Sequence, residues 1–132
     1  MDVLLVEDNP ADVYIIRHVL EDVRKDIRLW VMPDGPEALQ FLRKASSMTP
    51  VLTPVLILLD LRLRTTDGTE LLPQIRQLPN CQTTPIVIIT GIPWEREGTH
   101  CLQLGANAYI QKTANVYGFC EAIKEIAQRW LH

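Results

Sequence analysis

The stretch VLILLDLRL (55–63) decides the fold of this chain. Its first five residues are aliphatic, which is typical of a strand that is buried on both faces of a parallel sheet. Asp60 follows directly, and an ion so close to an apolar core is costly unless other groups pair with it. In open α/β sheets, ligand chemistry takes place beyond the carboxyl ends of the strands. We therefore expect Asp60 to lie at that edge, together with its partners.

Strand-like and helix-like segments alternate along the rest of the chain. Short apolar runs predict strands at 3–6, 27–32, 55–59, 85–89 and 108–110. Apolar residues at helical spacing predict helices that begin near 10, 35, 68, 93 and 116. Asp67, before Gly68, is expected to cap the third helix, and 46–54, rich in Pro, Ser and Thr, predicts a surface loop. Five such units imply an α/β fold with a parallel sheet that helices cover on both faces.

Composition bounds the class of protein. A chain of 132 residues, with 47% hydrophobic and 22% charged residues, suits a single globular domain. The net charge of −3 gives no reason to expect binding to nucleic acid or to a membrane surface, and no apolar run is long enough to span a bilayer. Cys81, Cys101 and Cys120 are odd in number and scattered, which indicates reduced thiols in a cytoplasmic protein.

Polar residues fall where the predicted strands end. Glu7 and Asp8 follow the first strand, Asp60 the third, Thr90 the fourth and Lys112 the fifth. Three carboxylates at one edge repel each other, and a hard cation such as Mg²⁺ would relieve that repulsion. A lysine and a hydroxyl suit the oxygens of a transferred phosphoryl group. The central carboxylate would then be a nucleophile that forms an acyl phosphate.

The arrangement resembles the receiver domain of two-component response regulators over essentially the whole chain. The motifs that carry the resemblance are LLVEDNP (4–10), ILLDLRL (57–63), DG (67–68), VIITG (87–91) and GANAYIQK (105–112). Each motif is weak alone, but together, in this order and at strand ends, they are specific. The resemblance implies a flavodoxin-like (βα)5 fold of three layers, with five parallel strands in the order 2-1-3-4-5. It also implies one receiver domain over 1–132 without an output domain.

The resemblance assigns a role to each acidic residue. Asp60 matches the phosphoacceptor, which takes phosphate from a histidine kinase or a phosphotransfer protein. Glu7 and Asp8 match the acidic pair that positions Mg²⁺, Asp8 directly and Glu7 mainly through water. Arg62, two residues after the phosphoacceptor, would offer its backbone carbonyl to the metal.

Three further residues match the parts that respond to the phosphoryl group. Thr90 matches the switch hydroxyl, and Lys112 matches the lysine that pairs with a phosphoryl oxygen. Tyr109 matches the aromatic residue whose rotamer follows the switch. The usual signalling surface of the family consists of the fourth helix, the fifth strand and the fifth helix.

The chain departs from the family pattern around the site. Thr113 stands where a proline with a cis peptide bond is usual, so we expect either a trans Lys112–Thr113 bond or a strained cis bond. Arg64 also replaces a common proline. Arg62 would shield the phosphoryl group, and Ile92, two residues after the switch hydroxyl, offers no polar side chain to orient water. We therefore expect slow dephosphorylation.

Two other functions compete with phosphoacceptance. A pseudo-receiver would bind partners without carrying phosphate, and Arg64 and Thr113 keep that alternative open. An aspartate-nucleophile phosphatase would need a second aspartate two residues after the nucleophile, where this chain has Arg62. We expect no enzyme activity beyond the Mg²⁺-dependent phosphorylation and dephosphorylation of the chain itself.

A finer resemblance concerns the partners. VEDNPAD (6–12), the long segment before the third strand and IAQRWL (126–131) are similar to the small stand-alone regulators of bacterial phytochrome-type kinases. That subgroup implies a phytochrome-type sensor kinase as partner and a homodimer through the signalling surface.

Overall fold

The sheet has five parallel strands in the order β2-β1-β3-β4-β5, which confirms the predicted topology. The computed structural model describes residues 1–132. The strands are β1 (Asp2–Val6), β2 (Arg28–Met32), β3 (Leu56–Leu59), β4 (Ile86–Thr90) and β5 (Ala108–Gln111). The helices are α1 (Pro10–Val23), α2 (Gly35–Ser46), α3 (Gly68–Arg76), α4 (Trp94–Gln103) and α5 (Val116–Trp130). None of these helices combines the length and the apolar character that crossing a membrane requires.

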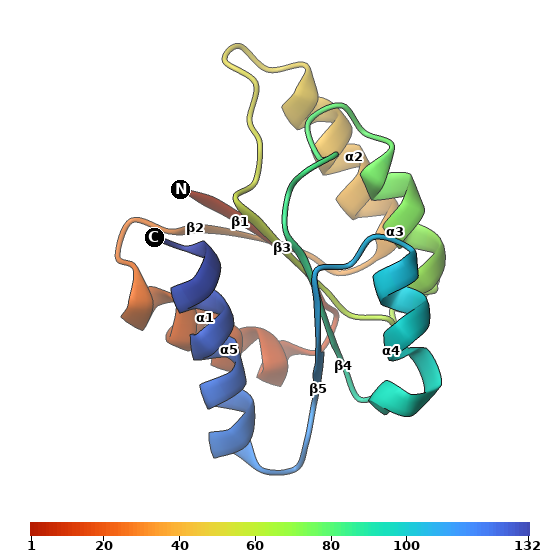
Figure 1. Cartoon of the computed structure of the whole chain (residues 1–132). Coiled ribbons are helices and arrows are strands. Elements are labelled where there is room, and N and C mark those ends of the chain that lie inside the picture. Colours follow the sequence, from red (N-terminus) through yellow and green to blue (C-terminus); the bar gives the residue numbers. More distant parts are fainter.

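Helices cover both faces of the sheet, so the molecule has three layers (Figure 1). Helices α1 and α5 lie on one face, and α2, α3 and α4 lie on the other. Successive residues of β3 alternate between the two cores: Ile57 packs on the side of α2 to α4, and Leu58 packs on the side of α1 and α5. All four residues of β3 are fully buried, as the run before Asp60 predicts. Burial on both faces fixes the position of the strand that ends at Asp60.

Polar caps start four of the five helices just beyond strand ends. Asn9 accepts hydrogen bonds from the first turn of α1, and Asp34 caps α2. Asp67 accepts the backbone N–H of Thr69 at 2.9 Å, which confirms its predicted role as the cap of α3. Asn115 caps α5. These caps place the helix N-termini at the same edge of the sheet as Asp60, where their dipoles favour negative charge.

Two connections test predictions made from the sequence. The predicted loop at 46–54 joins α2 to β3 and extends beyond the body of the molecule (Figure 1). Thr49–Pro50 is the only cis peptide bond, so the Lys112–Thr113 bond is trans. This is one of the two geometries that the replacement of proline by Thr113 predicts.

Candidate functional site

Three carboxylates gather beyond the adjacent strands β1 and β3. Oxygens of Glu7, Asp8 and Asp60 all lie within 4.8 Å of one another. The parallel register pairs Val6 with Leu59, so the residues that follow them emerge side by side. Glu7 is 2% exposed and Asp60 is 5% exposed, whereas Asp8 is half-buried. The structure thus brings together the acidic residues that the strand ends predict.

Lys112 follows β5, the edge strand of the sheet, and its side chain reaches the acidic cluster. Its backbone N–H donates to the Thr90 carbonyl at 2.7 Å, which continues the pairing of β4 with β5. Its Nζ donates to Asp60 Oδ2 at 3.0 Å and also to Glu7 Oε1. The ammonium therefore bridges two buried carboxylates, which is the arrangement that makes their burial tolerable.

Crowding of like charges perturbs the site. Burial and the neighbouring Asp60 raise the pKa of Glu7 to about 8, although Lys112 opposes the rise. Burial alone would lower the pKa of Lys112, but hydrogen bonding and charge from Asp12, Glu7 and Asp60 outweigh it and raise that pKa. A single ammonium does not balance the carboxylates, so the edge retains an excess of negative charge.

The donor set fits a hard divalent cation. Carboxylate oxygens are the preferred ligands of such ions, and the three oxygens here are close enough to share one. Glu7 Oε2 accepts the backbone N–H groups of Asp8 at 3.0 Å and Asn9 at 3.4 Å, which fixes the Glu7 side chain. Arg62 lies beside the cluster, since its backbone N–H donates to Asp60 Oδ1 at 3.1 Å, while its side chain is exposed.

Thr90 and Tyr109 meet at a different point, the backbone of Ile92. The Thr90 side chain is fully buried, and its Oγ1 accepts the N–H of Ile92 at 3.4 Å. Tyr109 donates its hydroxyl to the carbonyl of Ile92 at 2.6 Å. Burial first, with nearby Cys101 and Glu97 adding to it, raises the pKa of Tyr109 to about 12, so the phenol keeps its proton. No hydrogen bond joins the Thr90 hydroxyl to Asp60.

Sequence reasoning missed two acidic residues at this edge. Asp12, in the first turn of α1, lies 2.8 Å from Lys112 Nζ. Asp34 is buried and accepts both the backbone N–H of Thr65, at 3.0 Å, and its hydroxyl, which ties the start of α2 to the β3–α3 loop. An aspartate at a helix start is usually explained by capping or by the helix dipole, so the sequence carries no separate signal for these contacts.

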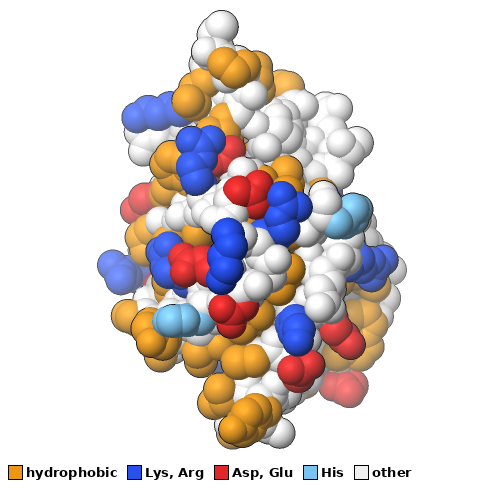
Figure 2. Space-filling model, turned by 90° about the vertical axis from the view of Figure 1, so that its left-hand side faces the viewer, with side chains coloured by type: hydrophobic (Ala, Val, Ile, Leu, Met, Phe, Trp, Pro, Cys, Tyr) orange, Lys and Arg blue, Asp and Glu red, His pale blue; other side chains and the backbone are white.

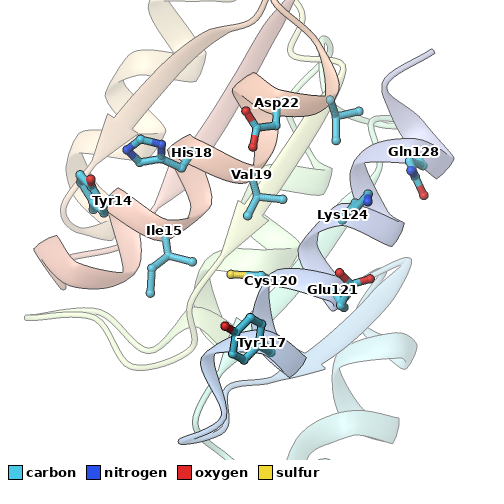
Figure 3. Close-up of a pocket in the computed structure, with 11 residues that line it drawn as sticks. Tyr14, Ile15, His18, Val19, Asp22, Tyr117, Cys120, Glu121, Lys124 and Gln128 are labelled. Carbon is cyan, nitrogen blue, oxygen red and sulfur yellow. The ribbon is translucent and has the colours of Figure 1, made fainter.

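A groove of the surface lies away from the acidic cluster. It has a volume of about 810 Å³ and runs between α1 and α5, where Ile15 and Val19 face Cys120 (Figure 3). Tyr14 and Tyr117 stand at one end and are 64% and 85% exposed. None of the residues that line the groove belongs to the acidic cluster.

Known proteins match this chain along nearly its full length. Residues 3–124 match the response regulator receiver domain family. The response regulator Rcp1 of Synechocystis sp. is 33% identical over 129 residues, covering 98% of this chain and 88% of Rcp1. A crystal structure of the phosphorylated cyanobacterial phytochrome response regulator RcpA is 34% identical, with a TM-score of 0.88 over 98% of this chain and 93% of that chain.

Solved relatives hold divalent cations. Rcp1 has been solved in a Mn²⁺-bound form, with a TM-score of 0.87 and 33% identity over 99% of this chain and 94% of that chain. The receiver domain of the sensor histidine kinase PA1611 from Pseudomonas aeruginosa was solved with a magnesium ion in its active-site cleft. That domain is 30% identical, with a TM-score of 0.74 over 98% of this chain and 96% of its own. The sequence, the fold and the acidic edge agree, and the chain belongs to the family of response regulator receiver domains of two-component systems.

Proposed function

We propose that Asp60 is the phosphoacceptor of this receiver domain, which all 132 residues form. The observation that carries the proposal is the bridge from Lys112 Nζ to Asp60 Oδ2 and Glu7 Oε1. The bridge places a point charge beside the carboxylate that would react. A pseudo-receiver would not need this pairing, and the intact set of acidic, hydroxyl and lysine residues favours phosphoacceptance.

The reaction is a transfer of one phosphoryl group. An oxygen of the Asp60 carboxylate attacks the phosphorus of a phosphohistidine or of acetyl phosphate. The P–N or P–O bond of the donor breaks, its electron pair leaves with the donor, and an acyl phosphate forms on Asp60. Lys112 then pairs with a phosphoryl oxygen and offsets the added charge.

Mg²⁺ is the cation that this site is proposed to use. Asp8 and Asp60 would bind it directly, Glu7 mainly through water, and Arg62 through its backbone carbonyl. When bound, the ion neutralises charge on the phosphoryl oxygens during transfer. The support is the cluster of carboxylate oxygens within 4.8 Å and the cations held by related receiver domains.

The output is proposed to begin at Ile92. A phosphoryl group on Asp60 attracts the Thr90 hydroxyl, which must release the Ile92 N–H to reach it. The Ile92 carbonyl is the acceptor of the Tyr109 hydroxyl, so movement of this peptide also changes the hydrogen bond of Tyr109. Phosphorylation would thereby bias two states of the β4–α4 loop, which a partner distinguishes.

The partners follow from the relatives and the surface. We propose a phytochrome-type histidine kinase as the phosphate source, because Rcp1 and RcpA cover nearly the whole chain. The surface of α4, β5 and α5 exposes Trp94, Leu102 and Val116 by 41%, 42% and 55%, which suits a homodimer contact. On the side of the molecule that carries α1, acidic and basic side chains are interspersed (Figure 2), so no field of one sign favours nucleic acid there.

Slow loss of the phosphoryl group is part of the proposal. Arg62 and Arg64 are exposed on the β3–α3 loop beside Asp60, and Ile92 contributes only backbone groups to hydrogen bonds. These residues offer charge to hold the phosphoryl group and nothing to orient an attacking water. A phospho-Asp60 that persists for many minutes in Mg²⁺ is expected, and a lifetime of seconds would contradict this.

Labelling by mass tests the phosphoacceptor directly. The protein is incubated with Mg²⁺ and acetyl phosphate, and its intact mass is followed. One phosphoryl group per chain is expected in the wild type and none in Asp60→Asn. Asp22→Asn, which removes an exposed carboxylate from α1, is the matched control and should label fully. Absence of labelling in the wild type would favour the pseudo-receiver, and turnover of many equivalents of a substrate would favour a phosphatase.

A further inference from the structure

Lys112 has more partners than the proposed chemistry uses. Its Nζ lies near three carboxylates: Glu7 and Asp60 accept its hydrogen bonds, and Asp12 Oδ2 is 2.8 Å away as an ion pair. An ammonium has three N–H donors and no more. A phosphoryl oxygen can therefore gain a strong bond from Lys112 only if one of the present partners gives up its place.

Glu7 is the partner that is hardest to release. Its side chain is 1% exposed, and its second oxygen is held by the backbone N–H groups of Asp8 and Asn9. A buried Glu7 side chain that loses Lys112 has no water to replace it, and a buried polar group without a hydrogen-bond partner is costly. Asp60 carries the phosphoryl group itself, so it stays next to Lys112.

Asp12 is the partner that can leave. Its side chain is 20% exposed, and its carboxylate takes part in no other hydrogen bond or ion pair. A carboxylate at the mouth of the site rehydrates at little cost when the ion pair opens.

We propose that Asp12 is a positioning residue that holds Lys112 in the unphosphorylated protein and releases it to the phosphoryl group. The proposal rests on the proposed function of Asp60. Asp12 holds the outer side of the ammonium while the site is empty of phosphate, and its release frees one N–H for a phosphoryl oxygen. Because Asp12 belongs to the first turn of α1, the exchange also reports the state of Asp60 to that helix.

The proposal predicts in which direction the loss of Asp12 shifts the balance between the unphosphorylated and the phosphorylated state. Asp12 stabilises the unphosphorylated state, so its removal favours the phosphorylated one. We expect Asp12→Asn to bind beryllofluoride, a mimic of the phosphoryl group, about fivefold more tightly at saturating Mg²⁺, the scale of a partly exposed ion pair. Binding is followed by tryptophan fluorescence. Asp22→Asn, which removes the same charge from the same helix, is expected to leave the affinity unchanged.

A double-mutant cycle separates positioning from simple charge repulsion. The same affinities are measured with Lys112→Ala and with the double variant. If Asp12 acts through Lys112, the gain from Asp12→Asn vanishes in the Lys112→Ala background. A gain that persists there, or an affinity of Asp12→Asn that is unchanged or weaker, overturns the proposal.

A spectroscopic measurement keeps the test decisive if Lys112→Ala binds too weakly. Water exchange of the Lys112 ammonium protons is followed by nitrogen-detected NMR. In the free protein, exchange should be faster in Asp12→Asn than in the wild type, and with beryllofluoride the two should exchange at the same rate. Equal rates in the free protein overturn the proposal. If the wild type binds no beryllofluoride at Asp60, the proposed function itself fails and the role of Asp12 falls with it.

Discussion

At the amino-terminal edge of the sheet, Asp2 lies between two donors, whereas at the carboxyl-terminal edge Lys112 is shared among three carboxylates. Trp30 Nε1 donates to Asp2 at 2.9 Å, and Arg28 forms an ion pair with it. Burial alone would raise the pKa of Asp2, but Trp30 and Arg28 outweigh burial and hold that pKa below its usual value. At the other edge, burial and Asp60 raise the pKa of Glu7 to about 8.

The difference shows which edge is built for stability and which for chemistry. Arg76 extends the pattern at the amino-terminal edge, where its guanidinium donates to the carbonyls of Cys81, Thr84 and Gly105 and to the side chain of Asn107. The polar groups named at that edge find their hydrogen-bond partners within the chain. At the carboxyl-terminal edge the carboxylates are in excess, and we propose that a cation and a phosphoryl group bind there, a cost to stability that functional sites commonly carry.

Removal of Arg76 should have the largest effect on stability. Arg76→Ala leaves several partly buried carbonyls without their donor, and we expect the free energy of unfolding to fall by about 3 kcal/mol. Urea denaturation measures the change. Arg43→Ala, at an exposed position of α2 without an ion pair, is the matched control and should stay within about 0.5 kcal/mol of the wild type. A similar loss in both variants would show that the Arg76 contacts contribute little.

Mg²⁺ should stabilise the protein through the opposite edge. At ten times its dissociation constant, a ligand of the folded state alone raises the free energy of unfolding by about 1.4 kcal/mol. We expect this gain in the wild type and no gain in Asp8→Asn, as measured by urea denaturation with Mg²⁺ or with EDTA. Asp22→Asn should respond like the wild type. Equal stabilisation of Asp8→Asn would remove Asp8 from the metal site.

Sequence patterns were sufficient for the parts of the site that follow from strand ends. Glu7 and Asp60 come directly after an apolar run, Asp8 and Lys112 come one residue later, and parallel strands bring such positions to one edge. The complete burial of β3 could be predicted from the same pattern of apolar residues. These predictions needed only the period of the apolar residues and the rule that the strands run parallel.

The contacts of Asp12, Asp34 and Arg76 could not be predicted in this way. Each depends on how far a side chain reaches from a helix or a turn toward a segment that is distant in the sequence. Local patterns describe Asp12 and Asp34 equally well as residues at helix starts. Their second role depends on the packing of α1 and of the β3–α3 loop, which the periodicity of a single element does not determine.

Neutralising one carboxylate of the acidic edge should stabilise the protein in the absence of metal. In Asp8→Asn, repulsion among Glu7, Asp8 and Asp60 is relieved, and we expect the free energy of unfolding in EDTA to rise by about 1 kcal/mol. Asp2→Asn, at the amino-terminal edge where the carboxylate is paired with Trp30 and Arg28, should instead lower the free energy of unfolding. Thermal or urea unfolding of the two variants side by side measures both signs. Destabilisation of Asp8→Asn in EDTA would show that the acidic edge is not under repulsion.

The smallest expected effect concerns the pH dependence of Asp2. Its pKa is lowered in the folded state from the usual 3.8, so its ion pair stabilises the fold above that value, and the contribution is lost as the pH falls through the lower, folded pKa. At pH 7, Asp2→Asn should lower the free energy of unfolding by about 0.5 kcal/mol, the scale of an exposed ion pair. The difference from the wild type should shrink below about pH 4, because the unfolded chain then binds the proton first. Urea denaturation at several pH values measures it, with Asp22→Asn as the control, since Asp22 and Lys25 are largely exposed and lie 3.9 Å apart. A difference that grows on acidification would mean that burial, rather than Trp30 and Arg28, controls Asp2, and the two edges would then treat charge alike.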